Sequence, residues 1–247
     1  MDRRQFLTSL LACPVCAATA SAADGPHWEY EGDHGAAKWG EMDSKFKACA
    51  VGAEQSPIDL SNAIRANGDH INIRWKAEAF EIVNNGHTIQ LNAKDGGTLA
   101  IGKRKYELKQ FHFHTPSEHA IDGERTSMEV HFVHATPEGR LAVIGVLMVG
   151  GGKNSAFSTI MANAPKKAGS AALKEKMVPD AFLPKTSEYF RYEGSLTTPP
   201  CSEVVDWNVF SKTIAVSNKD IEAFKALFPM NARPLQPLNR RFLLRGL

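Results

Sequence analysis

The sequence contains few cysteines and no strong excess of charge of either sign. Four cysteines occur in 247 residues, and 29 Lys and Arg nearly balance 27 Asp and Glu, which gives a formal net charge of +2. Because the basic residues are scattered, we expect no nucleic-acid-binding surface. The sequence also lacks internal repeats and, after its N-terminal segment, any linker rich in Pro, Gly or Ser. We therefore expect a single domain over residues 24–247, long enough to bury a large core.

No apolar run near the N-terminus is long enough to span a bilayer. Arg3 and Arg4 precede a short apolar run, and small residues follow it at positions 20–22. This order is typical of a signal peptide, which we place at residues 1–23 and expect to be removed. The mature protein is then periplasmic or secreted and has no membrane span. The paired arginines resemble a twin-arginine export signal, but the general secretory route stays open.

Most of the remaining sequence consists of short strand patterns between turn signals. They occupy residues 71–75, 80–83, 88–91, 98–101, 106–113, 128–135, 141–149 and 190–192. The stretch 141–149 is continuously apolar, which is typical of a central strand covered on both faces. Helices are few: one begins at Ser217, with Asp220 completing a capping box, and a weaker one covers 155–163. The pattern predicts a mainly β (α+β) fold with a large, mostly antiparallel sheet and short peripheral helices.

Three histidines lie in two of these strand patterns: His112, His114 and His131. Side chains alternate along a strand, so His112 and His114 share one face, while Phe111 and Phe113 point to the other. Reversal signals between the two strands predict antiparallel pairing that brings His131 beside His114. Three imidazoles with no nearby cysteine or fourth histidine indicate an open, catalytic zinc site with one ion per chain. The alternative is a set of ordinary buried or surface histidines.

A polar residue stands two positions before a histidine in each strand. Gln110 precedes His112 and Glu129 precedes His131, on the same face as the histidine. Metal-bound histidines usually donate their second ring N–H to such a partner. The spacing therefore predicts the orienting partners as well as the ligands.

Seven segments along the chain match motifs of one enzyme family, in the family's order. They are HWEY at 27–30, QSPID at 55–59, NNGH at 84–87, QFHFHTPSEH at 110–119, EVHFVH at 129–134, GSLTTPPCSE at 194–203 and NARPLQP at 231–237. On these residues the chain resembles the α-class carbonic anhydrases of the bacterial, exported kind. The resemblance implies the α-carbonic anhydrase fold, a twisted central sheet of about ten strands.

The resemblance also implies an activity and its residues. The chain would be a zinc-dependent lyase, a carbonate dehydratase, which reversibly hydrates CO₂ to bicarbonate and a proton through a zinc-bound hydroxide. In the family a threonine orients the hydroxide while donating to a buried glutamate, and the matching residues are Thr197 and Glu118. Thr198 would line the substrate and bicarbonate site. By motif position, the apolar CO₂ pocket would be lined by Val133, Val143, Leu196 and Val205.

The remaining family positions concern the proton and the state of the chain. His87 matches the family's proton shuttle, and Tyr30, Asn85 and Gln90 match residues that order the intervening water. Two alternatives stay open, namely a zinc esterase of the same fold and a non-catalytic carbonic anhydrase-like binding module. A monomer and a dimer are both compatible with the sequence.

Two cysteines remain once the predicted signal peptide, with Cys13 and Cys16, is removed. They are Cys49 and Cys201. Two cysteines in an exported protein favour one disulfide, and the family resemblance supports the same pair. The alternative is two buried free thiols.

Overall fold

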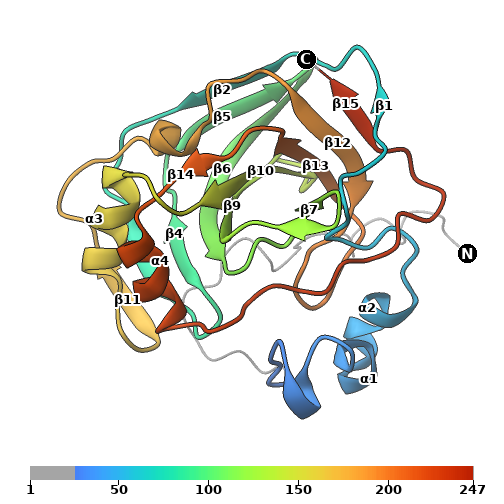
Figure 1. Ribbon diagram of the computed structural model, residues 1–247, viewed down its shortest axis with the longest axis horizontal. Helices are drawn as coiled ribbons and strands as arrows, with labels where there is room; N and C mark the ends of the chain where they lie inside the picture. The colour runs from blue at the N-terminus through green and yellow to red at the C-terminus, as the bar shows by residue number, and fades with distance from the viewer. Residues whose placement is uncertain (1–25, 247) are drawn as a thin grey trace, which may run out of the picture.

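The computed structural model describes residues 26–246 (Figure 1). The predicted signal peptide, residues 1–23, lies outside the described residues, and so do Arg3, Arg4, Cys13 and Cys16. Within the described part, no helix is long and apolar enough to cross a membrane. The α-helices are α1 (Trp39–Met42), α2 (Ala48–Val51), α3 (Ser155–Asn163) and α4 (Asn218–Lys225), and the 3₁₀ helices are η2 (Gly32–His34), η3 (Ser44–Phe46) and η4 (Pro179–Phe182). The strands are β1 (Ile64–Arg65), β2 (Ile71–Trp75), β3 (Glu81–Asn84), β4 (Ile89–Asn92), β5 (Gly97–Ile101), β6 (Arg104–His114), β7 (Ala120–Ile121), β8 (Glu124–Arg125), β9 (Met128–Ala135), β10 (Leu141–Val149), β11 (Gly169–Ala172), β12 (Tyr189–Gly194), β13 (Val205–Phe210), β14 (Ile214–Ala215) and β15 (Leu244–Gly246).

One large, curved sheet forms the body of the molecule (Figure 1). Across the described residues it has 13 strands, and its main path runs β1-β15-β12-β13-β10-β9-β6-β4-β3-β11. Most neighbours are antiparallel, as predicted, but β1 pairs with β15, and β10 with β13 and β14, in parallel. The sheet is therefore mixed. Parallel partners come from distant segments and need no hairpin turn, so the local turn signals do not reveal them.

The predicted central strand is confirmed. β10 lies between β9 and β13, and its residues from Ala142 to Met148 are all buried. A strand covered on both faces has no solvent side and therefore reads as a continuous apolar run. β9 and β10 have the bounds that their sequence patterns predict.

A β-bulge in β6 decides which side chains face the core. The register against β9 shifts between Leu108 and Gln110. Leu108 lies in the hydrophobic core before the bulge, and Phe111 and Phe113 lie there after it. One extra residue, Lys109, thus reverses the alternation, because a bulge re-aims the side chains that follow it. The bulge leaves the even-numbered residues from Gln110 onward free to face the other side.

Two helices cover the core face of the sheet. α3 and α4 lie side by side at one end of it (Figure 1), and Phe157 and Phe224 from them pack against Phe113. α4 begins as predicted: the Oγ of its N-cap Ser217 accepts from the Asp220 amide at 3.3 Å. A smaller apolar cluster lies around β10, β12 and β13 and includes Val143 and Trp207. The histidines of β6 and β9 are beside this second cluster.

Candidate metal centre

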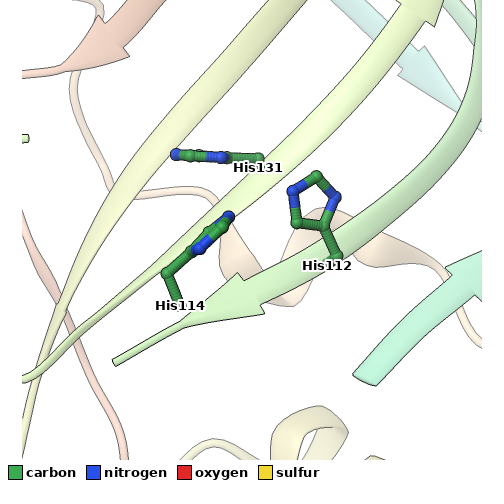
Figure 2. A group of neighbouring side chains, drawn as sticks. All are labelled: His112, His114 and His131. Atoms are coloured by element: carbon green, nitrogen blue, oxygen red, sulfur yellow. The ribbon is translucent and has the colours of Figure 1, made fainter. Parts of the chain in front are cut away.

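Three histidine rings, those of His112, His114 and His131, lie together on two neighbouring strands (Figure 2). His112 and His114 project from β6 and His131 from β9, and one ring nitrogen of each lies within 4.8 Å of those of the other two. The backbone register pairs His131 with His112. The ring of His131 nevertheless lies closer to that of His114, with centroids 4.6 Å apart, than to that of His112, at 5.4 Å. The three rings lie close enough together to share one metal ion.

Two of the imidazoles are held by the side chains that the sequence predicts. His112 Nδ1 lies 2.8 Å from Gln110 Oε1. His131 Nε2 lies 2.9 Å from Glu129 Oε1. The contact of His112 is a hydrogen bond, whereas that of His131 has an ion-pair distance without hydrogen-bond geometry among the described residues. The two contacts leave Nε2 of His112 and Nδ1 of His131 for another ligand.

The third imidazole has a partner that sequence reasoning missed. His114 Nδ1 donates to the backbone carbonyl of Asn231 at 2.7 Å, across a sequence separation of 117 residues. Strand periodicity cannot reveal a contact of this range, although Asn231 does stand in one of the matched motifs. His114 Nε2 is buried and has no hydrogen-bond partner among the described residues. A buried nitrogen without a partner is costly unless a ligand satisfies it.

The Glu129 carboxylate is the hub of a buried network. Its Oε1 contacts His119 Nδ1 at 2.8 Å as well as His131, and its Oε2 accepts from the His119 amide at 2.9 Å. His119 Nε2 lies 2.7 Å from the hydroxyl of Tyr192. Gly145, opposite His131 on β10, makes room for this carboxylate, because a Cβ there would lie 2.9 Å from Glu129 Oε1. His119 thus helps to hold the Glu129 carboxylate in place.

The environment favours neutral rings at two of the three positions. Burial holds the pKa of His112 well below its usual value, and the neighbouring His114 and His131 lower it further. Burial also lowers the pKa of His114. Burial lowers the pKa of His131 too, but the carboxylates of Glu129 and Glu118 outweigh it, so that this pKa is raised. Neutral imidazole is the form that binds a metal.

Glu118 lies directly beside the histidines and is fully buried. Its Oε1 accepts from the backbone amide of Arg233 at 2.8 Å. Its Oε2 lies 3.6 Å from His114 Nε2 and 3.8 Å from His131 Nδ1. The predicted hydrogen bond from Thr197 is not formed, because Oε2 has no hydrogen-bond partner among the described residues. This oxygen is therefore free to accept one.

Two of the three histidines, His112 and His131, lie at a cavity of about 430 Å³. Its walls include His112 and His131 and, of the predicted substrate residues, Val133, Val143, Leu196, Thr197 and Thr198. Val205 does not line it: this side chain is 3% exposed and belongs to the apolar cluster around Val143. Trp207, two residues further along β13, lines the cavity and packs on His131 with ring centroids 4.8 Å apart. Sequence reasoning missed Trp207 because β13 was not recognised as a strand.

The residues predicted for the proton path are divided between two cavities. Gln90 lines the histidine cavity. His87 and Tyr30 line another cavity of about 310 Å³, and the ring of His87 stacks on Trp28 with centroids 3.8 Å apart. Asn85 does not point its oxygen at either, because Oδ1 accepts from the backbone amides of His87 and Thr88, both at 2.9 Å. It caps the turn that carries His87.

The predicted disulfide between Cys49 and Cys201 is confirmed, with an S–S distance of 2.07 Å. Cys49 lies in α2, and Cys201 ends the loop that carries Thr197 and Thr198. The amide of Cys201 donates to the Thr198 carbonyl at 2.9 Å. The disulfide thus ties one wall of the cavity to the N-terminal helices.

Comparison with known proteins identifies the family. The model of the eukaryotic-type carbonic anhydrase family matches residues 34–245. A carbonic anhydrase of Pectobacterium carotovorum is 38% identical over 240 residues, 96% of this chain and 98% of that protein. Among solved structures, the α-carbonic anhydrase of Photobacterium profundum is 43% identical, covers 88% of this chain and 100% of its own, and has a TM-score of 0.83. A hyperthermostable carbonic anhydrase from a hydrothermal vent chimney is 41% identical, covers 90% of this chain and 100% of its own, and has a TM-score of 0.87. The sequence, fold and histidine cluster of the present chain place it in the α-carbonic anhydrase family, whose members are enzymes that use zinc to interconvert CO₂ and bicarbonate.

Proposed function

We propose that His112, His114 and His131 hold the zinc ion of a carbonic anhydrase site. The observation that carries the proposal is the convergence of three histidines whose ring nitrogens lie within 4.8 Å of one another. The buried Nε2 of His114, which has no hydrogen-bond partner in residues 26–246, supports it. Three nitrogen ligands with a further position open are the donor set of catalytic zinc. When bound there, zinc supplies a Lewis acid that lowers the pKa of water, as is known for carbonic anhydrases.

The residues around the histidines would orient the reactants. Glu118 is buried, and an ionised carboxylate only accepts hydrogen bonds, so its free Oε2 would direct the hydroxyl hydrogen of Thr197 toward itself. The lone pairs of that hydroxyl then accept a hydrogen bond from the reacting oxygen. CO₂ has no net dipole, and the wall formed by Val133, Val143 and Leu196 offers it an apolar surface. Trp207 would close the same wall beside His131.

His87 would take the proton away from the site. Histidine titrates near neutrality, and His87 lies in a turn and lines a cavity of about 310 Å³. Gln90, opposite His112 on β4, would order the water between the two. Transfer through water is required because the ring of His87 stacks on Trp28 and does not line the histidine cavity.

The mature protein would be an exported single domain that begins at about residue 24. The Cys49–Cys201 disulfide supports an oxidising compartment. The periplasm is such a compartment in bacteria, and the bacterial relatives match over nearly their whole length.

Zinc analysis combined with stopped-flow CO₂ hydration tests the proposed site. His131→Ala should lose most of the zinc and the activity, because only two nitrogen ligands remain and Glu129 loses one of its two histidine partners. His70→Ala is the matched control, since His70 is exposed and lies outside the site. A His131→Ala protein with full zinc content and full hydration would refute the assignment.

The same preparation separates the two alternative functions. A dedicated zinc esterase should hydrolyse an activated ester while lacking fast CO₂ hydration. A non-catalytic binding module should show neither activity even when it is loaded with zinc.

A further inference from the structure

His87 lies among ionisable groups that the proposed function does not use. Its ring stacks almost parallel on Trp28, with 7° between the planes. The cavity beside it, about 310 Å³, is also lined by His27, Glu29 and Glu31. The segment after α4 adds apolar residues to the lining, among them Phe228. The ionisable groups around His87 in this cavity therefore come from the N-terminal segment 27–31.

His27 and Glu29 form a pair at the outer edge of this group. His27 Nε2 lies 3.2 Å from Glu29 Oε1, and both side chains are mostly exposed. The ring of His27 lies 6.5 Å from that of His87 and 6.1 Å from that of His34. These distances are too long for direct hydrogen bonds between the rings but short enough for one bridging water. The three histidines thus form a series that ends in solvent.

The charges of the pair also act on His87. Burial lowers the pKa of His87, His27 lowers it further, and Glu29 raises it. The pKa of His87 therefore depends on both His27 and Glu29, although the two histidine rings are not in direct contact.

We propose that His27, supported by Glu29, is a second proton acceptor that passes the proton of His87 on to buffer in solution. The inference rests on the proposed role of His87. A proton leaves the imidazolium of His87, crosses one water and arrives on His27 Nδ1, because Nε2–H of the neutral ring donates to Glu29. It then leaves for a buffer base, and His27 returns to its neutral form. In CO₂ release the same protons move in the opposite direction.

Glu29 has a positioning role in this scheme. Its carboxylate fixes the tautomer of His27 and stabilises the positive charge that the ring acquires. Both groups are exposed, so solvent screens their attraction. The series also gives the proton on His87 a path to solvent through the exposed His27, which shortens the time for which His87 stays protonated.

CO₂ hydration in weak and strong buffer tests the proposal on the full-length, zinc-loaded protein. His27→Ala should lower kcat in weak buffer and leave kcat/KM unchanged, because proton removal and the attack on CO₂ are separate steps.

Glu29→Gln should give a smaller loss of kcat in weak buffer, up to about fivefold, the range of a screened ion pair. Imidazole should restore both variants, and Glu29→Asp should keep most of the wild-type rate. Glu41→Gln, an exposed carboxylate in α1 that lines neither cavity, is the matched control.

Double variants separate this inference from the role of His87 itself. With His87→Ala already present, His27→Ala should cause no further loss, since the series is broken before it reaches His27. An independent, multiplicative loss would overturn the inference, and so would an unchanged kcat of His27→Ala in weak buffer. A His87→Ala protein with a normal kcat in weak buffer would instead contradict the proposed shuttle.

Discussion

At the level of single residues, the candidate metal centre depends on steric room around Glu129 as well as on charge. Glu129 is fully buried, and one of its oxygens contacts both His119 and His131. Burial alone would raise the pKa of this carboxyl, but His119 and His131 more than offset it, so that the pKa lies well below its usual value. The contacts to these two histidines therefore favour the ionised carboxylate. A substitution that displaces the Glu129 carboxylate should therefore weaken zinc binding even though all three histidines are kept.

Gly145→Ala is expected to be such a change. Its Cβ would lie 2.9 Å from Glu129 Oε1 and 3.2 Å from Val209 Cγ2, so the carboxylate must move away from His131. We expect zinc affinity to fall about 10- to 100-fold, the usual effect of losing the partner of a metal-bound histidine. Competition with a chelator measures it. Adding Val209→Ala relieves the other contact only, so full recovery of affinity in the double variant would contradict this explanation.

His134 should make the folded state less stable in acid. This histidine is completely buried on the core side of β9, where its Nε2 accepts from Trp75 Nε1 at 2.9 Å. Burial lowers its pKa from 6.5 to about 3. Below pH 6.5 the unfolded chain therefore binds a proton that the folded chain rejects, and stability is lost as the pH falls toward 3.

His134→Gln keeps an acceptor for Trp75 but removes this titration. Between pH 6 and 4 the free energy of unfolding should fall less steeply than in wild type, by up to about 1.4 kcal/mol per pH unit. Urea unfolding of the two proteins across this range measures the difference. His70→Gln, in an exposed position, should keep the wild-type slope. Equal slopes for His134→Gln and wild type would contradict the expectation.

At the level of elements, the sequence predicts best those strands whose signal is local. β9 and β10 were predicted with their observed bounds, because one alternates between two buried faces and the other is apolar throughout. β13 was missed, although Val205, Trp207 and Val209 alternate. Its partner β10 is parallel and 64 positions away in the register of Leu141 with Val205. Its antiparallel partner β12 is separated from it by the loop 195–204, so no tight turn marks either pairing. Because β13 was missed, Trp207 was also absent from the predicted wall of the cavity.

The bulge in β6 corresponds to a break in the apolar pattern of the sequence. Buried residues occupy positions 106 and 108 and then 111 and 113, a break in the period of two. The alternation of side chains along the strand correctly predicted that His112 and His114 share one face. It could not tell that this face changes sides within the same strand, because that depends on where the register shifts against β9.

Deleting Lys109 should therefore remove the metal centre. Without the extra residue, an uninterrupted alternation would put the side chains of Gln110, His112 and His114 on the core side and expose Phe111 and Phe113. We expect a chain that binds no zinc and does not fold stably. Lys109→Ala is the matched control, since it keeps the length of the strand and should bind zinc normally. Near-normal zinc content in the deletion variant would show that the bulge can move along the strand.

At the level of the whole molecule, the site is assembled from segments far apart in the chain. Arg233 is almost completely buried, and its guanidinium donates to Gln55 Oε1 at 2.8 Å and to the Cys49 carbonyl at 3.1 Å. The amide of the same residue donates to Glu118. The C-terminal segment thus connects the site to the N-terminal part that also carries the disulfide. Local sequence patterns cannot predict such contacts, whereas the motif match placed these residues in one family.

The disulfide should contribute to this assembly chiefly by restricting the unfolded chain. It joins residues 152 positions apart, so reducing it releases a long loop in the unfolded state. Replacing Cys49 and Cys201 by Ser should lower the free energy of unfolding by about 2–4 kcal/mol. The folded variant should still bind zinc, because the loop with Thr197 keeps its internal hydrogen bond from the Leu196 amide to the Ser202 carbonyl and its contact to β13, in which Trp207 Nε1 donates to the Ser195 carbonyl. Wild type unfolded in reducing buffer is the matched control and should agree with the variant. Equal stability of the variant and the oxidised wild type would mean that the long-range hydrogen bonds of Arg233 hold the N-terminal segment without help from the disulfide.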